Sequence, residues 1–514
     1  MPHTSTRPLN TKTLLSDLQK LVRKLEDDLR ERSTTDSDVQ GRLRSEWDQE
    51  RAAGHTASTY ETWRDDYLTQ VAVAWILACV FVRWMEDNDF LTEVFLAGED
   101  QRMKRAHDTH DQYVNTHPTD SDKDYLLHVF ATVAKLPACE DLLSQAHNPL
   151  WRVAISADAG KLLLGFWQAT NPDTQELLRV FESSDTRFLG DLYQDLSEAA
   201  RKKYALLQTP DFVEEFILDR TLEPAIQEFG LEQVRMIDPT CGSGHFVLGA
   251  FQRLLGHWGR TAPGMSATAR VIRSLEAVAG VDLNPFAVAI ARFRLLVAAL
   301  AACGVRRMKD APDFHMNLAT GDSLLHGRRF DRTGQYTFDK EQEHWLPDAF
   351  AAGDFEQATK ILSRQYHVVV GNPPSITEKD EAHREYVRKQ YDSCYQKFSL
   401  AVPFTERFFD LARYGDGNGE AGFVGMITAN SFMKREFGKK LIESYLSEVD
   451  LTHVIDTSGA YIPGHGTPTV VLFGRHRPPQ VRTIRAVMGI RGEPGTPSVP
   501  AAGEVWQAIL GQLD

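Results

Sequence analysis

Hydrophobic residues recur at intervals of three and four between residue 11 and about residue 200, with charged residues between them. Leu14, Leu18, Leu21, Leu25 and Leu29 begin this pattern. A period of 3.6 residues is that of an amphipathic α-helix. We therefore expect an α-helical N-terminal domain over residues 1–188.

After residue 210 the pattern changes to short apolar runs that alternate with helix-like stretches. Such alternation is typical of an α/β fold, in which helices cover the faces of a mostly parallel sheet. We therefore expect an α/β domain over residues 189–477. The expected strands lie at residues 234–237, 277–281, 368–370, 422–427, 451–455 and 469–473.

The last part of the chain, residues 478–514, is rich in proline and glycine and has one apolar stretch at residues 505–510. This composition is typical of a linker. We expect a linker here, or the start of a further domain.

Composition and charge narrow the class of protein. The 514 residues are 42% hydrophobic and 25% charged, which is ordinary for a globular protein and excludes disordered and collagen-like chains. The net charge of −14 argues against a small basic nucleic-acid-binding module, although a large enzyme can still carry local basic patches.

The longest apolar run, residues 71–82, ends at Arg83 and is shorter than the roughly 20 residues that cross a bilayer, so we expect a buried core helix there. The N-terminus lacks the charged-then-apolar pattern of a signal peptide, and the five cysteines form no CxxC pair. These features predict a cytoplasmic protein with no membrane partner and no metal site.

Candidate chemistry begins where the first expected strand ends, in the sequence MIDPTCGSGHF at residues 236–246. Glycines let the backbone approach a ligand closely, and the start of the following helix offers N–H groups to an anion. The candidate ligand-binding residues are Asp238, Pro239, Cys241, Gly242 and Gly244. Alone, this loop could equally be a tight strand-to-helix turn of any doubly wound fold.

Two further strands also end in acids. Asp282 follows the second strand, where a carboxylate can accept hydrogen bonds from ribose hydroxyls, although a helix N-cap is the alternative role. Asp322 follows a short strand at residues 318–320 and could accept a bond from an adenine amino group.

The most specific motif is VVVGNPPS at residues 368–375, an apolar strand that runs into Asn372, Pro373, Pro374 and Ser375. Two consecutive prolines remove two backbone donors and stiffen the turn. Carbonyl oxygens and the asparagine amide are left as acceptors, so this turn is a candidate cradle for an NH₂ group.

In their order and spelling, these four motifs resemble the gamma-type amino DNA methyltransferases, which transfer methyl from S-adenosylmethionine to adenine N6. The resemblance spans about residues 189–477 and implies a Rossmann-like methyltransferase sheet. It also implies that residues 204–210 form a cofactor motif, with Thr209 near the methionine carboxylate. The N-terminal residues Trp63, Tyr67 and 84–87, together with GNPPS, more narrowly resemble methyltransferases of phage growth limitation (BREX type 2) systems. That resemblance implies bacterial protein partners in phage defence.

One departure from the family concerns base stacking. An aromatic residue usually follows Asn-Pro-Pro and stacks on the flipped adenine, worth about 1–3 kcal/mol per base. Ser375 cannot stack. Tyr461 and Phe398 are the candidates to supply the ring, and the alternative is that both are ordinary core or loop aromatics. We expect weaker capture of the base, or dependence on a partner.

The expected function is therefore site-specific adenine-N6 methylation of double-stranded DNA, with the target adenine flipped out of the duplex. Two alternatives remain: methylation of an RNA base or a protein amide, and a catalytically weak sensor subunit that binds cofactor and DNA. Few residues follow the expected catalytic sheet, so we expect another part of a longer protein, or a separate subunit, to read most of the DNA sequence.

Overall fold

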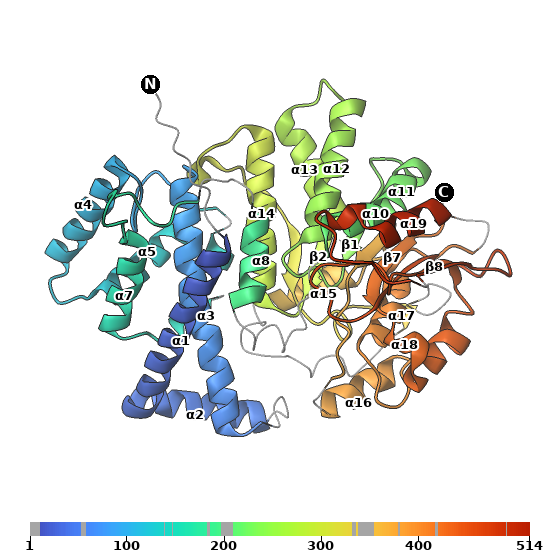
Figure 1. Cartoon of the computed structure of the whole chain (residues 1–514), viewed down its shortest axis with the longest axis horizontal. Coiled ribbons are helices and arrows are strands. Elements are labelled where there is room, and N and C mark those ends of the chain that lie inside the picture. The colour runs from blue at the N-terminus through green and yellow to red at the C-terminus, as the bar shows by residue number, and fades with distance from the viewer. Residues whose placement is uncertain are drawn as a thin grey trace. The chain divides into compact units, whose positions relative to one another are not determined.

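The structure, a computed structural model, describes residues 11–52, 58–137, 139–145, 148–181, 186–196, 209–330, 336–337, 354–378, 381–416, 420–489 and 491–513. The chain divides into two compact units (Figure 1). Unit 1 is Met1–Lys203 with Arg292–Phe314, and unit 2 is Tyr204–Ala291 with His315–Asp514. Residues 292–314, which the sequence analysis placed in the second domain, are thus part of the first unit.

Unit 1 is helical, as the periodicity predicted. The five leucines of the first helix are all buried, so they form its core-facing side. The helix α3 carries the apolar run at residues 71–82, and every residue of that run is buried. The helices of this unit are α1 (Thr11–Thr35), α2 (Ser37–Ala52), α3 (Tyr60–Asp87), α4 (Gln101–Thr116), α5 (Asp122–Val133), α6 (Glu140–Leu143), α7 (Ala157–Gln168) and α8 (Arg187–Leu196), with short 3-10 helices η1 (Pro149–Trp151) and η2 (Met308–Asp310).

Two helices are long and apolar enough to cross a membrane by length and composition: α3 and α14 (Pro285–Cys303). However, 89% and 72% of their most apolar windows are buried inside the protein. Such burial is expected of core helices, and the prediction of a buried core helix at residues 71–82 is confirmed.

Unit 2 contains an eight-stranded sheet of order β10-β8-β9-β7-β6-β1-β2-β3. Neighbouring strands are parallel except at β9, which is antiparallel to both β7 and β8. All of the expected strands form. They are β1 (Met236–Asp238), β2 (Val278–Asp282), β3 (Asn317–Thr320), β6 (Val368–Gly371), β7 (Phe423–Ala429), β8 (Asp450–Asp456) and β9 (Thr469–Arg475).

Helices pack on this sheet and build the core of unit 2. Residues of α17, among them Phe408 and Phe409, share one buried cluster with Ile237, Val369 and Val424 of the strands. The longer helices of the unit are α10 (Asp211–Asp219), α11 (Leu222–Phe229), α12 (His245–Thr261), α13 (Ala267–Ala277), the start of α14, α15 (Phe355–Leu362), α16 (Glu381–Gln390), α17 (Ala401–Leu411) and α19 (Glu504–Leu513). The short elements are β4 (Arg329–Phe330), β5 (Tyr336–Thr337), α18 (Ser431–Lys434), η5 (Glu436–Gly438), η6 (Leu441–Tyr445) and η7 (Pro500–Ala502).

The expectation of a linker over residues 478–514 needs correction, because two segments of this region belong to the folded unit. The strand β10 (Arg485–Met488) pairs in parallel with β8 and extends the sheet. Trp506 of α19 is buried, and its ring lies 5.2 Å from that of Phe216 on α10 and 4.9 Å from that of Phe212. The apolar stretch at residues 505–510 thus lies in a helix that packs through Trp506 and Ile509. The prolines and glycines before it give the region the composition of a linker.

Candidate functional site

The four motifs lie side by side at the carboxyl edge of the sheet. The strands β6, β1, β2 and β3 are consecutive parallel neighbours, and Asp238 is in register with Gly280 while Asp282 is in register with Thr320. Ligands of open α/β sheets bind outside the carboxyl ends of the strands. The sheet therefore brings together the residues that the sequence analysis proposed separately.

The glycine-rich loop makes a tight turn into α12. Gly242 and Gly244 have φ values of +51° and +86°, a region that favours glycine. The Gly244 N–H donates to the Cys241 carbonyl at 2.8 Å, and a Cβ added to Gly244 would lie 2.9 Å from the Cβ of Ala291. A Cβ at Gly242 would have nothing within 4 Å. Gly242 therefore leaves open space at the point where the backbone could approach a ligand, while buried Cys241 and Pro239 fix the turn.

Asp282 supports this loop from the neighbouring strand. Its carboxylate accepts hydrogen bonds from the backbone N–H groups of Gly242 and Asn284, each at 2.9 Å. Burial raises the pKa of Asp282. The helix α14 begins at Pro285, and the Asn284 side chain accepts from Phe286 N–H at 3.0 Å, so Asn284 caps that helix. This arrangement disfavours the N-cap alternative for Asp282.

Asp238 is buried beneath the same edge and accepts bonds from the backbone and side chain of Thr240, at 2.9 and 3.1 Å. Burial raises the pKa of Asp238 to about 8, and the nearby Asp282 carboxyl adds to the effect. A Cβ added to Gly371 would lie only 2.5 Å from the Asp238 carboxylate. The end of β6 therefore lies against Asp238 and Thr240 at the start of the glycine-rich loop, and Asn372 is the next residue of the chain.

Asp322 lies in the turn after β3 and is buried. One of its oxygens accepts from Leu324 N–H at 2.9 Å, and the other pairs with His383 Nε2 of α16 at 3.2 Å. His383 Nδ1 lies 3.2 Å from the Glu378 carboxylate. Sequence reasoning missed His383 and Glu378, because no motif marks them and only the fold brings them to Asp322.

The charged groups around Asp322 and His383 shift the pKa of both side chains. Burial alone would raise the pKa of Asp322, but the hydrogen bond and charge of His383 outweigh burial and lower it. Burial alone would lower the pKa of His383, but the two carboxylates outweigh burial and raise it to about 10. At neutral pH we therefore expect an imidazolium between two carboxylates.

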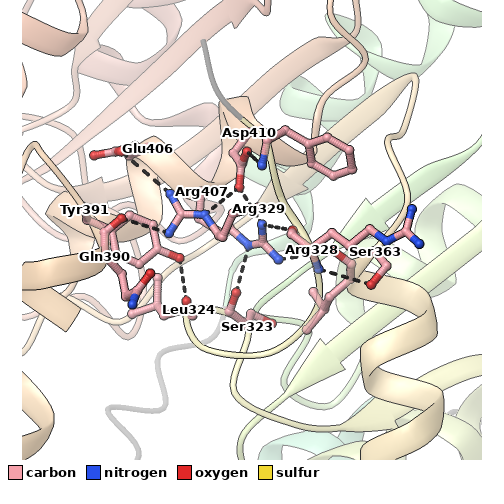
Figure 2. A network of polar contacts seen from close by, with 12 residues as sticks. Ser323, Leu324, Arg328, Arg329, Ser363, Gln390, Tyr391, Glu406, Arg407 and Asp410 are labelled. Carbon is pink, nitrogen blue, oxygen red and sulfur yellow. Dashed lines mark hydrogen bonds and ion pairs between the residues drawn. The ribbon is translucent and has the colours of Figure 1, made fainter. Parts of the chain in front are cut away.

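A buried polar network fixes the chain that follows Asp322 (Figure 2). Arg407 of α17 donates to the carbonyls of Ser323 and Arg328, each at 2.9 Å, and also pairs with Asp410 at 2.5 Å. Arg329 donates to Asp410 at 3.0 Å. Because buried charges are costly unless paired and hydrogen-bonded, these contacts tie residues 323–329 firmly to α17.

The Asn-Pro-Pro turn is anchored through its last residue. Ser375 Oγ lies 3.0 Å from Thr428 Oγ1 and accepts from Ala429 N–H at 3.1 Å, both at the end of β7. The serine that cannot stack on a base therefore has a structural role: it fastens the turn to the neighbouring strand.

Replacing Ser375 with alanine is expected to destabilise unit 2, because the buried Ala429 N–H loses its acceptor at a cost of about 1–3 kcal/mol. Urea unfolding of the intact chain measures this loss. The matched control is Ser447→Ala, since Ser447 is exposed and its hydroxyl donates to the Glu443 carbonyl within its own turn. Equal unfolding midpoints for the two variants would show that the Ser375 bonds contribute nothing.

The structure separates the two candidates for base stacking. Phe398 is fully buried in the core of unit 2, so its assignment as a stacking residue needs correction. Tyr461 is 38% exposed and lies in the loop between β8 and β9, at the carboxyl end of β8. Because β8 and β7 both run antiparallel to β9, this loop leaves the same edge of the sheet as Asn372.

Thr209 is buried just before α10, a helix that packs on α12 behind the glycine-rich loop. Residues 204–208 of the same expected motif lie outside the described residues. Among the residues that the structure describes, no group of three or more His, Cys, Asp or Glu side chains could hold a metal ion.

Known proteins that are similar to this chain agree with the methyltransferase motifs at the edge of the sheet. Residues 276–462 match the Eco57I restriction-modification methylase family. The chain is 48% identical to the adenine-specific methyltransferase PglX of Streptomyces coelicolor over 98% of its own length, but this match covers only 43% of that protein. The chain thus spans less than half the length of this relative.

Solved structures show the same fold at low sequence identity. The DrdV–DNA complex matches 94% of this chain and 44% of its own chain, with 14% identity and a TM-score of 0.52. The Type IIL restriction-modification enzyme MmeI, solved in complex with DNA, matches 95% of this chain and 60% of its own, with 13% identity and a TM-score of 0.53. The chain therefore shares the fold of these structures, an α/β sheet with a helical N-terminal part. The expected resemblance to adenine-specific methyltransferases is borne out by the 48% identity to PglX.

Proposed function

We propose that this chain carries the catalytic part of a site-specific adenine-N6 DNA methyltransferase that uses S-adenosylmethionine. The observation that carries the proposal is the meeting of four loops at one edge of the sheet: the glycine-rich turn, Asp282, Asp322 and the Asn372 cradle. The similarity to PglX over nearly the whole chain supports the same activity.

The residues at this edge fit S-adenosylmethionine. Open space at Gly242 and the start of α12 would accept the methionine part, with Thr209 as a further candidate contact. Asp282 would accept hydrogen bonds from the ribose hydroxyls, and Asp322 would accept one from the adenine amino group. When bound, the cofactor supplies an electrophilic methyl group on a sulfonium.

The cradle would activate the target amine. The lone pair of an adenine amino nitrogen is conjugated with the ring, which makes the nitrogen a poor nucleophile. The Asn372 amide oxygen and the Pro373 carbonyl would accept its two N–H groups and draw the lone pair out of conjugation. Pro374 and the Ser375 bonds keep these acceptors in place, so catalysis is mostly positioning and electrostatics.

Double-stranded DNA is the proposed substrate, with the target adenine flipped into the pocket at a cost of a few kcal/mol. Exposed basic residues follow β7 near the carboxyl edge: Lys434, Arg435, Lys439 and Lys440. They are positioned to contact phosphates beside the flipped base. The basic residues Arg384, Arg388 and Lys389 of α16 are a second candidate surface for phosphates. Both clusters are partly engaged within the protein, because Arg388 pairs with Glu385 at 2.5 Å and Lys439 with Glu443 at 4.0 Å.

Replacing all four basic residues after β7 with alanine is expected to weaken DNA binding and flatten its salt dependence, by about 0.9 in log–log slope for each phosphate that is no longer neutralised. Fluorescence anisotropy with a labelled duplex at several salt concentrations measures this slope. The control is Lys360→Ala with Arg364→Ala, two exposed residues close to the amino end of β6. An unchanged slope in the quadruple variant would remove this surface from the DNA interface.

The wider biological setting is also part of the proposal: a cytoplasmic enzyme that works with protein partners of a bacterial phage-defence system. Two alternatives make different predictions. A methyltransferase for RNA or protein amides would transfer label to those substrates and not to DNA. A catalytically weak sensor would bind cofactor and DNA without turnover. Transfer of a labelled methyl group to DNA, RNA and protein in parallel separates the three.

A further inference from the structure

His383 connects two loops that the proposed reaction uses for different purposes. Its Nε2 lies 3.2 Å from Asp322, the candidate acceptor for the cofactor's adenine, and its Nδ1 lies 3.2 Å from Glu378. Glu378 follows the Asn372–Ser375 cradle in the same loop. The Asp322 side chain is 8% exposed, and those of His383 and Glu378 are 17% and 24% exposed, so the bridge is buried at its Asp322 end and partly open to water at Glu378.

The C-terminal end of α16 contacts the segment that follows Asp322, residues 323–329. Arg329 donates to the carbonyl of Gln390, the last residue of the helix, at 3.2 Å. The Tyr391 hydroxyl donates to the Leu324 carbonyl at 2.7 Å, and Figure 2 shows both residues within the buried network of Arg407. With its C-terminal end anchored there, α16 has a fixed position from which His383 reaches Asp322.

On the basis of the proposed function, we propose that His383 is a positioning residue. Its bridge between Asp322 and Glu378 couples the cofactor pocket to the loop that carries the Asn372 cradle. Cofactor binding and the position of the Asn372 cradle then depend on each other, although Glu378 and the cofactor's adenine need not touch. None of the four motifs includes His383, so this coupling is an addition to them.

The charges around His383 define how the coupling responds to pH. Facing it are Asp322 and Glu378, with His326 on the far side of Asp322 and Arg384 bonded to the Glu378 carbonyl. The imidazolium holds the pKa of Asp322 below its usual value. Without this charge, burial raises the pKa of Asp322, and its carboxylate becomes protonated as the pH falls. The acceptor for the cofactor amine then loses its charge and becomes weaker at low pH.

The test is calorimetric binding of S-adenosylhomocysteine to the intact chain between pH 8 and pH 5.5. His383→Gln keeps a donor for Asp322 but removes the charge, so we expect about tenfold weaker binding at pH 7.5. The ratio of wild-type to variant affinity should grow as the pH falls. Glu378→Gln should also weaken binding, and the double variant should bind no worse than His383→Gln alone.

His257→Gln is the matched control, because His257 pairs with Glu223 at 2.9 Å in a separate histidine–carboxylate contact. A constant affinity ratio for His383→Gln across the pH range, or additive effects of the two substitutions, would overturn the coupling. If His383→Gln does not fold, the Glu378→Gln variant decides alone, since an unchanged affinity there contradicts the bridge. Failure of the wild-type chain to bind S-adenosylhomocysteine would instead contradict the proposed function.

Discussion

Replacing Asn372 with alanine is expected to slow methyl transfer to adenine about 10²- to 10³-fold, the usual effect of removing one preorganised hydrogen-bonding group from a reacting centre. The Asn372 amide oxygen is the side-chain acceptor of the cradle, and the remaining acceptor, the Pro373 carbonyl, cannot hold both N–H groups. Cofactor affinity should stay close to the wild-type value, because the proposed acceptors for the cofactor are Asp282 and Asp322 and not the Asn372 amide.

Single-turnover kinetics at saturating cofactor, together with calorimetry of S-adenosylhomocysteine, separates these two effects. The retained binding also serves as the control for folding. Wild-type turnover in the Asn372→Ala variant would contradict the proposed mechanism, and loss of cofactor binding would show that Asn372 supports the cofactor pocket instead.

Replacing Asp282 with alanine is expected to give the opposite pattern, with cofactor affinity lowered about 10- to 100-fold by the loss of hydrogen bonds to a charged acceptor. The loss has two sources in the structure. The ribose would lose its acceptor, and the N–H of Gly242 loses the carboxylate that holds the glycine-rich turn in shape. Methyl transfer should recover in large part at saturating cofactor.

Titration of the methyl-transfer rate with S-adenosylmethionine measures this shift as a raised KM with a smaller change in kcat. Asp392→Ala is the control, since Asp392 is exposed on the same unit. A reduced kcat with an unchanged KM would assign Asp282 to the chemical step and contradict its role as a ribose acceptor.

Much of the fold could be predicted because local patterns dominate it. The leucines of α1 and the apolar run of α3 specify helices by periodicity alone, and the strand runs of unit 2 are short, apolar and bounded by turn residues. The strand β10 escaped prediction because three of its four residues are exposed, so no apolar alternation marks it. Residues 292–314 escaped because α14 is one continuous apolar helix that starts in unit 2 and ends in unit 1.

The residues of the candidate site also fall into two groups: those that local sequence patterns reveal and those that only the fold brings together. Asp238, Asp282, Asp322 and Asn372 could be proposed because each lies at the carboxyl end of a strand or within two residues of it, and a parallel sheet gathers such positions at one edge. The partners of these residues depend on long-range packing. His383 reaches Asp322 across 61 positions of sequence, and Ser375 reaches Thr428 across 53, which no local pattern reveals. The burial of Phe398 likewise follows from the packing of α16 and α17 and not from its neighbours in sequence.

The measurement that tests the central claim most directly is transfer of the labelled methyl group from S-adenosylmethionine to duplex DNA carrying unpaired adenines, followed by digestion to nucleosides. An unpaired adenine is easier to flip, which reduces the demand on sequence recognition. We predict label in N6-methyldeoxyadenosine with the wild-type chain and none above background with Asn372→Ala. Label only in RNA or protein, or no label in DNA although the cofactor is bound, would contradict the assignment of this chain as an adenine-N6 DNA methyltransferase.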